Sequence, residues 1–371
     1  MTAPDPMLTA NETERRLRSL EQWLESRLDG ASDLALEHLG KPGSGFSAET
    51  IILRATWNED GRPRDERFVL RQENPDPAIY PPQTPALDGA VEVDLQYRLM
   101  QALSAASDLP LAPLVDFEPE ASLVGTPFFV MGFVDGVVPV EAPMYTLEGF
   151  FTELTPEQRT AMVDDGMRML ATVHRVDWRD AGLDWLVAPD EAPTAARQLA
   201  IWERYADDAL RGREHAPLAA AFDWLRANQP EESEPALCWG DPRPGNIIWN
   251  DGLAACVTDF EAAYIGPPEL DLGWWLMFDR WSHETSGLSE RAPGDPTREQ
   301  QIATYESLVG RSVGDMTWYE LFAAARYAAI VVKVMNRWVD RGDLDADHTI
   351  WIDNPVVPCL ESLLAEVGAS A

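Results

Sequence analysis

The feature that most constrains this sequence is a short polar segment, Asp241-Pro-Arg-Pro-Gly-Asn246, followed thirteen residues later by Asp259. An Asn-Asp-Gly turn at residues 250–252 lies between them, with a short apolar run on each side. Turns of this kind between apolar runs predict a two-residue β-hairpin loop. The hairpin would place Asn246 at the start of one strand, beside Asp259 at the end of the other. Two carboxylates and one amide oxygen are therefore expected to converge, although the 241–246 segment alone is equally compatible with a plain β-turn.

Such a set of oxygen atoms suits phosphoryl transfer. Mg²⁺ prefers hard oxygen ligands of the kind that Asp and Asn supply, and it neutralises charge on the transferred group. A separate aspartate accepts or orients the attacking hydroxyl. The Asp-x-x-x-x-Asn spacing of residues 241–246 is the kinase catalytic-loop pattern, and Asp259-Phe-Glu261 stands where the metal-binding Asp-Phe-Gly would be.

Composition narrows the class of partner. The chain has 371 residues, 45% of them apolar, which is enough for a full core in two domains. Its net charge of −34 repels phosphate backbones and anionic lipid surfaces, so neither nucleic acid nor a membrane is an expected partner. The start of the chain lacks the apolar run of a signal peptide, and no stretch of 18 apolar residues occurs. We therefore expect a soluble cytoplasmic protein.

The order of predicted elements is strands with one helix first, and then mostly helices. A helix is expected at 11–29, strands at 50–57, 67–71 and 127–133, and a second helix at 88–105. Thr155-Pro-Glu-Gln158 has the form of a capping box and predicts a helix start. Further helices are expected at 194–212, 216–228, 298–310 and 316–341, with one β segment at 236–259 between them. The stretch 286–296 is rich in turn residues and predicts a mobile surface loop.

These motifs together resemble the aminoglycoside phosphotransferase (APH)-like family. The resemblance rests on Trp239-Gly-Asp-x-x-x-x-Asn246, on Asp259-Phe-Glu261, and on Gly266-Pro-Pro-Glu-Leu-Asp-Leu-Gly-Trp-Trp275. It points in particular to the bacterial branch related to the kinase-like domains of some acyl-CoA dehydrogenases, and it covers roughly residues 40–340.

The resemblance implies a role for each matching position. Asp241 would be the catalytic base, with Arg243 of the same loop touching the γ-phosphate or substrate, or forming a salt bridge instead. Asn246 and Asp259 would bind Mg²⁺, and Asp271 would steady the catalytic loop. The resemblance also implies a nucleotide site. Its phosphate-covering loop would be Gly43, Ser44, Gly45, Phe46 and Ser47, and Arg71 would be the cation that binds the nucleotide. The hinge that binds adenine through backbone groups would contain Val130, Met131 and Phe133.

Two departures from the family pattern bear on activity. Arg71 stands where most kinases have lysine, and arginine also pairs with phosphates. The helix position that usually supplies a glutamate partner is Gln96, so Asp94 or Glu92 substitutes for it or the pair is absent. Two further groups leave alternatives open: Glu261 contacts metal or substrate or caps the next segment, and His174 lies on an apolar helix face that favours a core position.

The predicted fold is a bilobal α+β, protein-kinase-like one. A small N-lobe over 1–133, with an antiparallel sheet of five strands, would carry the N-terminal helix, covering loop and hinge. A mainly helical C-lobe over 134–371 would carry the catalytic loop and substrate site. The predicted function is ATP- and Mg²⁺-dependent transfer of the γ-phosphate to a hydroxyl of an aminoglycoside-like compound, a hydroxylated metabolite or a hydroxyacyl-CoA. The alternatives are a nucleotide-binding pseudokinase acting as a regulatory module, and a kinase-shaped scaffold.

Overall fold

The protein is described here from a computed structural model that covers residues 10–40, 49–74, 76, 78–141, 143–285, 287 and 290–369. The chain divides into two compact units. Unit 1 comprises Met1–Ala78, Ala90–Gln101 and Ala112–Val134, and unit 2 comprises Ile79–Gly89, Ala102–Leu111 and Asp135–Ala371. Two segments that precede residue 133 therefore belong to unit 2.

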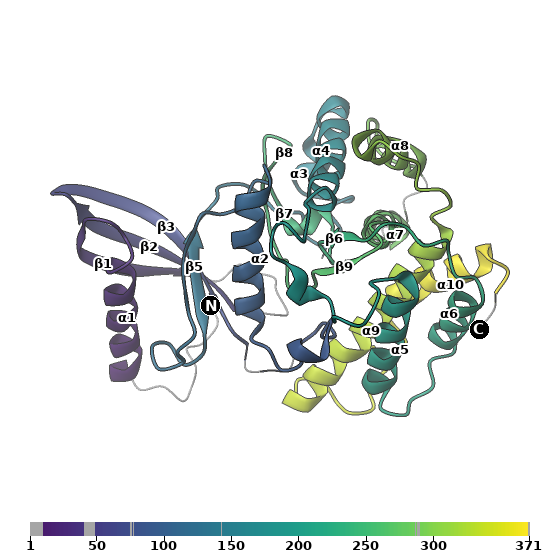
Figure 1. Ribbon diagram of the computed structural model, residues 1–371, viewed down its shortest axis with the longest axis horizontal. Coiled ribbons are helices and arrows are strands. Elements are labelled where there is room, and N and C mark those ends of the chain that lie inside the picture. The colour runs from purple at the N-terminus through teal and green to yellow at the C-terminus, as the bar shows by residue number, and fades with distance from the viewer. Residues whose placement is uncertain are drawn as a thin grey trace. The chain divides into compact units, whose positions relative to one another are not determined.

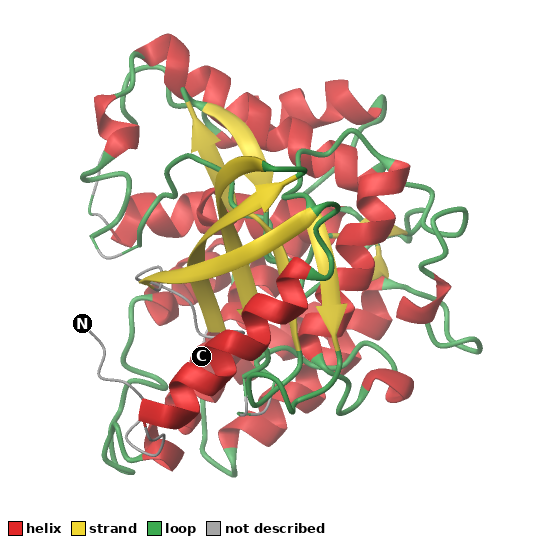
Figure 2. Ribbon diagram, turned by 90° about the vertical axis from the view of Figure 1, so that its left-hand side faces the viewer, coloured by secondary structure: helices red, strands yellow, loops and turns green. Residues whose placement is uncertain are grey.

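Unit 1 is built on an antiparallel sheet of five strands in the order β1-β2-β3-β5-β4 (Figure 2). Its elements, labelled in Figure 1 except for β4, are α1 (Ala10–Glu25), β1 (Ala31–Gly40), β2 (Glu49–Glu59), β3 (Arg62–Gln72), α2 (Glu92–Ala106), β4 (Leu114–Glu118) and β5 (Phe128–Gly132). The last residues of α2 lie in unit 2. The predicted strands, the two helices and the five-stranded sheet are confirmed, while β1 and β4 were not located from sequence.

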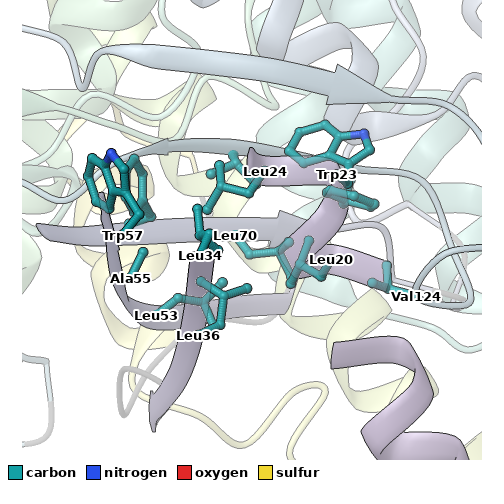
Figure 3. Packing of buried hydrophobic residues seen from close by; sticks show 13 residues of the cluster. Leu20, Trp23, Leu24, Leu34, Leu36, Leu53, Ala55, Trp57, Leu70 and Val124 are labelled. Carbon is teal, nitrogen blue, oxygen red and sulfur yellow. The ribbon is translucent and has the colours of Figure 1, made fainter. Parts of the chain in front are cut away.

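Buried and exposed side chains alternate along β2, and the buried ones form part of the core of unit 1. Leu53, Ala55 and Trp57 on β2 are buried, whereas Arg54 and Thr56 between them are exposed. Their buried face meets α1, and Figure 3 shows side chains from α1, β1, β2 and β3 meeting in this cluster. The β2–β3 connection is a two-residue loop at Asp60 and Gly61, whose φ angles of 50° and 78° fit a tight hairpin turn.

Unit 2 is mainly helical, with two small antiparallel ladders. Its helices are α3 (Phe150–Glu153), α4 (Pro156–His174), α5 (Ala195–Leu210), α6 (Ala216–Ala227), α7 (Glu269–Thr285), α8 (Arg298–Val309), α9 (Thr317–Arg341) and α10 (Val356–Glu366). Its strands pair as β6 (Ala236–Cys238) with β9 (Tyr264–Gly266), and β7 (Ile247–Asn250) with β8 (Leu253–Val257). Short 3₁₀ turns occur at Pro85–Leu87, Asp184–Leu186 and Pro244–Asn246.

Local sequence signals set several of these boundaries. Helix α4 begins at a complete capping box, in which the Thr155 hydroxyl accepts from the Gln158 amide and the Gln158 side chain accepts from the Thr155 amide. Helices α7 and α9 lie so close together at Gly273 that a Cβ added there would be only 2.6 Å from the Cβ of Tyr319. Helices α7 and α10 were not anticipated from sequence.

The segment 286–296 differs from its prediction as a mobile surface loop. Its described end is tied to α7: Arg291 forms an ion pair with Asp279, and Asp295 bonds the His283 ring over 2.8 Å. Asp295 is 8% exposed. Turn-forming composition suggested a mobile loop, but Arg291 and Asp295 pair with partners from α7. Across the part of the chain that the structure describes, no helix is both long and apolar enough to cross a membrane.

Candidate active site

The β7–β8 hairpin forms as its turn sequence predicts. Asp251 and Gly252 have φ angles of 50° and 77°, the left-handed pair that a two-residue hairpin loop needs. At the open end of the hairpin, the amide and hydroxyl of Thr258 donate to the carbonyl of Asn246 over 2.9 and 3.0 Å. Asn246 therefore lies across from Thr258, next to Asp259, as the sequence predicts.

The residue before Asp241 is Gly240, and any side chain at this position would force the neighbouring backbone to move. Gly240 follows β6 with φ of 91°, and a Cβ there would lie 2.0 Å from the carbonyl oxygen of Ala262. The close approach brings the loop after β6 against the segment after β8. Both the φ angle and the contact require glycine at this position.

Four donors converge on the carboxylate of Asp241, which is 5% exposed. Its Oδ1 accepts the indole N–H of Trp274 over 2.7 Å. Its Oδ2 accepts from Asn246 Nδ2 at 2.8 Å, Arg243 Nε at 3.2 Å and the Tyr80 hydroxyl at 3.3 Å. The side chain is thus fixed in orientation, with Oδ2 shared among three groups.

Burial raises the pKa of Asp241 to about 7, and the negative charge of Asp259 adds to the rise. The hydrogen bonds from Trp274 and Asn246, together with the charge of Arg326, oppose it. A carboxyl with a pKa near neutrality exchanges protons readily at physiological pH, which is what a general base requires. Two carboxyl groups whose charges repel at one site are also typical of functional centres.

Asp259 adopts a backbone conformation that is uncommon outside glycine, with φ of 64°. The indole N–H of Trp239 holds this backbone by donating to the carbonyls of Thr258 and Asp259 over 2.9 and 3.1 Å. Residues held in sparsely populated φ/ψ regions cluster at ligand sites.

The donor set fits a magnesium ion. Asn246 directs its Nδ2 to the carbonyl and Oδ2 of Asp241, so its Oδ1 takes no part in those bonds. A carboxylate at Asp259 and an amide oxygen at Asn246 are ligands that Mg²⁺ prefers.

Asp271, at the start of α7, anchors the loop that carries Asp241. Its buried carboxylate accepts the backbone amides of Trp239 at 2.6 Å and Gly240 at 3.1 Å. The Nε2 of His174 lies 3.2 Å from the same carboxylate, and its Nδ1 lies 2.6 Å from the hydroxyl of Tyr305. This is the contact that the resemblance implied for Asp271, and it places His174 in the core.

Arg326 is a second anchor, contributed by α9 from far along the chain. Its guanidinium is 1% exposed and donates to the carbonyl of Gly240 over 3.0 Å. The rings of Trp202 and Trp274 stack on it, with centroids 4.7 and 4.4 Å from its Cζ. Buried charges persist where they are paired in this way, so Arg326 both holds the loop and offsets the charge of Asp241.

Of the two predicted roles for Arg243, the structure shows the salt bridge. Its guanidinium pairs with Glu141 and with Asp241, and its Cζ lies 5.4 Å from the ring of Phe278. These contacts hold the arginine beside the carboxylate in this structure.

Unit 1 places Arg71 on β3, where it contacts a helix residue. Arg71 donates to the Thr50 hydroxyl over 2.7 Å and to Gln96 Oε1 over 3.3 Å. Gln96, on α2, is buried and occupies the partner position that the sequence indicated. Neutral oxygen atoms of a strand residue and a helix residue are thus among the partners of the Arg71 side chain.

The predicted hinge lies on β5 and just after it. Val130 is buried and pairs with Leu70, while Met131 pairs with Val69. The amide of Phe133 donates to the carbonyl of Arg67, whose guanidinium stacks 4.1 Å from the Phe133 ring. Gly43, Ser44, Gly45, Phe46 and Ser47 lie outside the described residues.

Three residues at this site were not found from sequence: Tyr80, Trp274 and Arg326. Each reaches Asp241 or Gly240 from an element distant in the chain. Trp274 lies within the quoted Gly266–Trp275 motif, in which the resemblance assigned a role to Asp271 alone. Tyr80 sits in a proline-rich loop, and Arg326 in a helix whose other residues are mostly apolar, so neither carried a local signal.

Comparison with known proteins supplies the family. Residues 41–313 match the model of the phosphotransferase enzyme family (APH). The mouse acyl-CoA dehydrogenase family member 10 is 25% identical over 86% of this chain, and the match spans 28% of that relative's length.

Two solved structures share the fold. A proposed aminoglycoside phosphotransferase from Ralstonia eutropha has a TM-score of 0.68 and 23% identity, over 95% of this chain and 99% of its own. The GDP and kanamycin complex of APH(2")-IIIa has a TM-score of 0.57 and 13% identity, over 94% of this chain and 98% of its own. These likenesses confirm the predicted bilobal, kinase-like α+β fold. Because the family model covers most of its length, the chain belongs to the phosphotransferase enzyme family.

Proposed function

We propose that this chain transfers the γ-phosphoryl group of Mg·ATP to a hydroxyl group of a small molecule. The observation that carries the proposal is the convergence of Asp241, Asn246 and Asp259 at the open end of the hairpin, with Asp241 buried and held by directed hydrogen bonds. Asp241 would orient the acceptor hydroxyl and take its proton. The acceptor oxygen bonds to the γ-phosphorus while the bond to the bridging oxygen breaks, so ADP leaves.

The chain's own residues would mainly position groups and shape the local field. Asn246 and Asp259 would hold Mg²⁺, which supplies neutralising charge at the phosphates when bound. Arg71 would pair with phosphate oxygens, and residues 43–47 would cover them. Val130, Met131 and Phe133 would line the adenine site, where Phe133 would use its carbonyl because its amide is already engaged with Arg67. Fixed donors of this kind contribute most of the rate in phosphoryl transfer.

A recess beside Arg243 bears on the class of acceptor. It is small, with an accessible volume of about 10 Å³, about the room that one water molecule needs. Its lining combines the Arg243–Glu141 pair with mostly apolar side chains, among them Met144, Phe278 and Trp281. An apolar wall favours an acceptor with an apolar portion, such as a hydroxyacyl-CoA or another hydroxylated metabolite, over a polycationic aminoglycoside.

One observation supports a second candidate, a catalytically weak nucleotide-binding module. Gln96 meets Arg71 where the family usually places a charged partner. The two candidates differ in turnover: ATP consumption that Asp241→Ala abolishes supports the enzyme, and Mg·ATP binding without such turnover supports the module.

The deciding experiment measures the melting temperature with and without Mg·ATP. A ligand that binds only the folded state stabilises it, by about 2.7 kcal/mol at a hundredfold excess over Kd. We expect a Mg²⁺-dependent rise in the native chain, its loss in Asp259→Ala, and its retention in Asp223→Ala, which removes an exposed carboxylate paired with Arg226. No rise at millimolar nucleotide would contradict the proposal. An acceptor panel of acyl-CoA derivatives, hydroxylated metabolites and aminoglycosides would follow.

A further inference from the structure

The hydroxyl of Tyr80 lies 3.3 Å from Oδ2 of Asp241, the oxygen that the proposed reaction needs for the acceptor. That oxygen also accepts from Asn246 Nδ2 at 2.8 Å and Arg243 Nε at 3.2 Å. A carboxylate oxygen has two lone pairs, so three donors already crowd it, and a fourth approaches only by taking the position of one of these three. The Tyr80 contact is the longest of the three.

Hydrogen bonds from α5 hold the segment that carries Tyr80. Within Ile79–Gly89, the carbonyl of Ile79 accepts the hydroxyl of Tyr205 over 2.6 Å. Gln83, which is 8% exposed, accepts at its Oε1 from Gln198 Nε2 over 2.8 Å, and its carbonyl accepts from Arg197. All three donors come from α5. These bonds fix the loop on both sides of Tyr80.

The surroundings keep the phenol in its neutral, hydrogen-donating form. Burial raises the pKa of Tyr80 well above its ordinary value, and the negative charges of Asp241, Glu261 and Asp259 raise it further. A neutral hydroxyl that donates to Oδ2 of Asp241 is the same chemical group, at the same atom, that an acceptor alcohol would present to the base.

On the basis of the function proposed above, we infer that the Tyr80 hydroxyl occupies the place of the acceptor hydroxyl and that a true acceptor displaces it. Tyr80 is then a specificity-determining residue. Water, which offers one small hydroxyl and no other contact, competes poorly with a phenol held by its own loop. A larger acceptor gains binding energy elsewhere in the site and uses it to move Tyr80 away from Asp241.

The inference is tested through hydrolysis of Mg·ATP with water as the only acceptor. In that reaction the water oxygen bonds to the γ-phosphorus, the bond to the bridging oxygen breaks, ADP leaves, and the water proton passes to Asp241. Tyr80→Phe keeps the ring but frees a place at Oδ2, so the rate of phosphate release should rise about tenfold, the order expected from losing one hydrogen bond to a charged group. Tyr205→Phe, which leaves Tyr80 intact but releases Ile79, should raise the rate in the same direction by a smaller factor.

Tyr319→Phe is the matched control, because it removes the hydroxyl of a buried phenol that packs on Trp318, with ring centroids 5.3 Å apart. Its hydrolysis rate should equal that of the native chain. The Mg·ATP-induced rise in melting temperature should be the same in Tyr80→Phe and the native chain. If that rise is present and the hydrolysis rate of Tyr80→Phe is unchanged or lower, the inference is overturned while the proposed function stands. If the native chain shows no rise, the proposed function fails and this inference fails with it.

Discussion

The indole N–H of Trp274 donates to Oδ1 of Asp241 over 2.7 Å inside the protein, where neither group meets bulk water. The bond favours the ionised carboxylate and so lowers the pKa of Asp241 against the effect of burial. Trp274 also stacks on Arg326, so one side chain links the candidate base to the cation that holds its loop.

Replacing Trp274 by phenylalanine should therefore shift the pH dependence of turnover. The pKa of Asp241 rises when the bond to its charged form is lost, so the ascending limb of the pH–rate profile should move up by about one to two pH units. The measurement is kcat/KM for ATP consumption between pH 5 and 9. Trp275→Phe is the control, because that indole donates instead to Gln301 over 2.8 Å. A limb that moves equally in both variants would contradict the prediction.

The raised pKa of Asp241 also predicts a pH dependence of stability. Its pKa is about 7 in the folded chain against an ordinary value of 3.8, so between these values the folded chain holds a proton that the unfolded chain has released. The contribution of Asp241 to the free energy of unfolding therefore falls as pH rises through this window and is constant above it.

Urea unfolding of the native chain and of Asp241→Asn at several values between pH 5 and 8 checks this. The variant has no carboxyl to titrate, so its free energy of unfolding relative to the native chain should increase with pH, by on the order of 1–4 kcal/mol in all. Asp223→Asn, which removes an exposed carboxylate, controls for the change in net charge. A difference between Asp241→Asn and the native chain that does not change with pH would show that Asp241 titrates normally.

Arg71 yields a prediction for nucleotide binding. If its guanidinium pairs with phosphate oxygens, Arg71→Ala should raise the Kd for Mg·ATP about 10–100-fold, the value of one or two charge-assisted hydrogen bonds. The Kd is measured by titration calorimetry. Arg54→Ala makes the same change in net charge at β2, where Arg54 pairs with Asp65, and should leave the Kd unaltered. Equal Kd values for Arg71→Ala and the native chain would remove Arg71 from the nucleotide site.

The parts of the site that sequence predicted are those with a local cause. The Asn-Asp-Gly turn selects its hairpin through left-handed φ angles, and the hairpin then brings Asn246 beside Thr258 and Asp259. The capping box at Thr155 likewise depends on residues three apart. The role of Asp271 came from the resemblance, because nothing in its neighbours reveals that it accepts two amides from a loop more than thirty residues earlier.

The parts that sequence missed depend on packing between distant segments. Tyr80 reaches Asp241 across 161 positions, because α5 holds its loop in place. Arg326 appears in sequence as one of several charged residues in a mostly apolar helix, and only the fold shows aromatic rings around it. In segment 286–296, turn-forming composition indicated mobility, but ion pairs with α7 hold its described end. Such contacts have no period or motif by which to be recognised.

The last prediction concerns Arg326. Its replacement should change both the stability of the fold and the pKa of Asp241, and these two effects can be measured separately. Arg326→Met keeps most of the buried volume but leaves the Gly240 carbonyl without this donor and the aromatic rings without their cation. The free energy of unfolding should fall by about 2–4 kcal/mol, and the pH–rate limb should move up because the charge of Arg326 lowers the pKa of Asp241. Both are measured, by urea unfolding and by kcat/KM against pH.

Arg213→Met is the matched control for this change. Arg213 also stacks on an aromatic ring, because its Cζ lies 5.1 Å from the ring centroid of Trp351. Its Nε donates to the backbone carbonyl of Leu210 over 2.9 Å. Its loss should lower stability and leave the pH–rate limb in place, since its described hydrogen bonds are to α5 and α9 and not to the loop that carries Asp241. Arg326→Lys keeps the charge without the planar stacking, so it should restore the position of the limb more fully than the stability. If Arg326→Met lowers stability but leaves the limb where it is, Arg326 supports the fold without influencing Asp241.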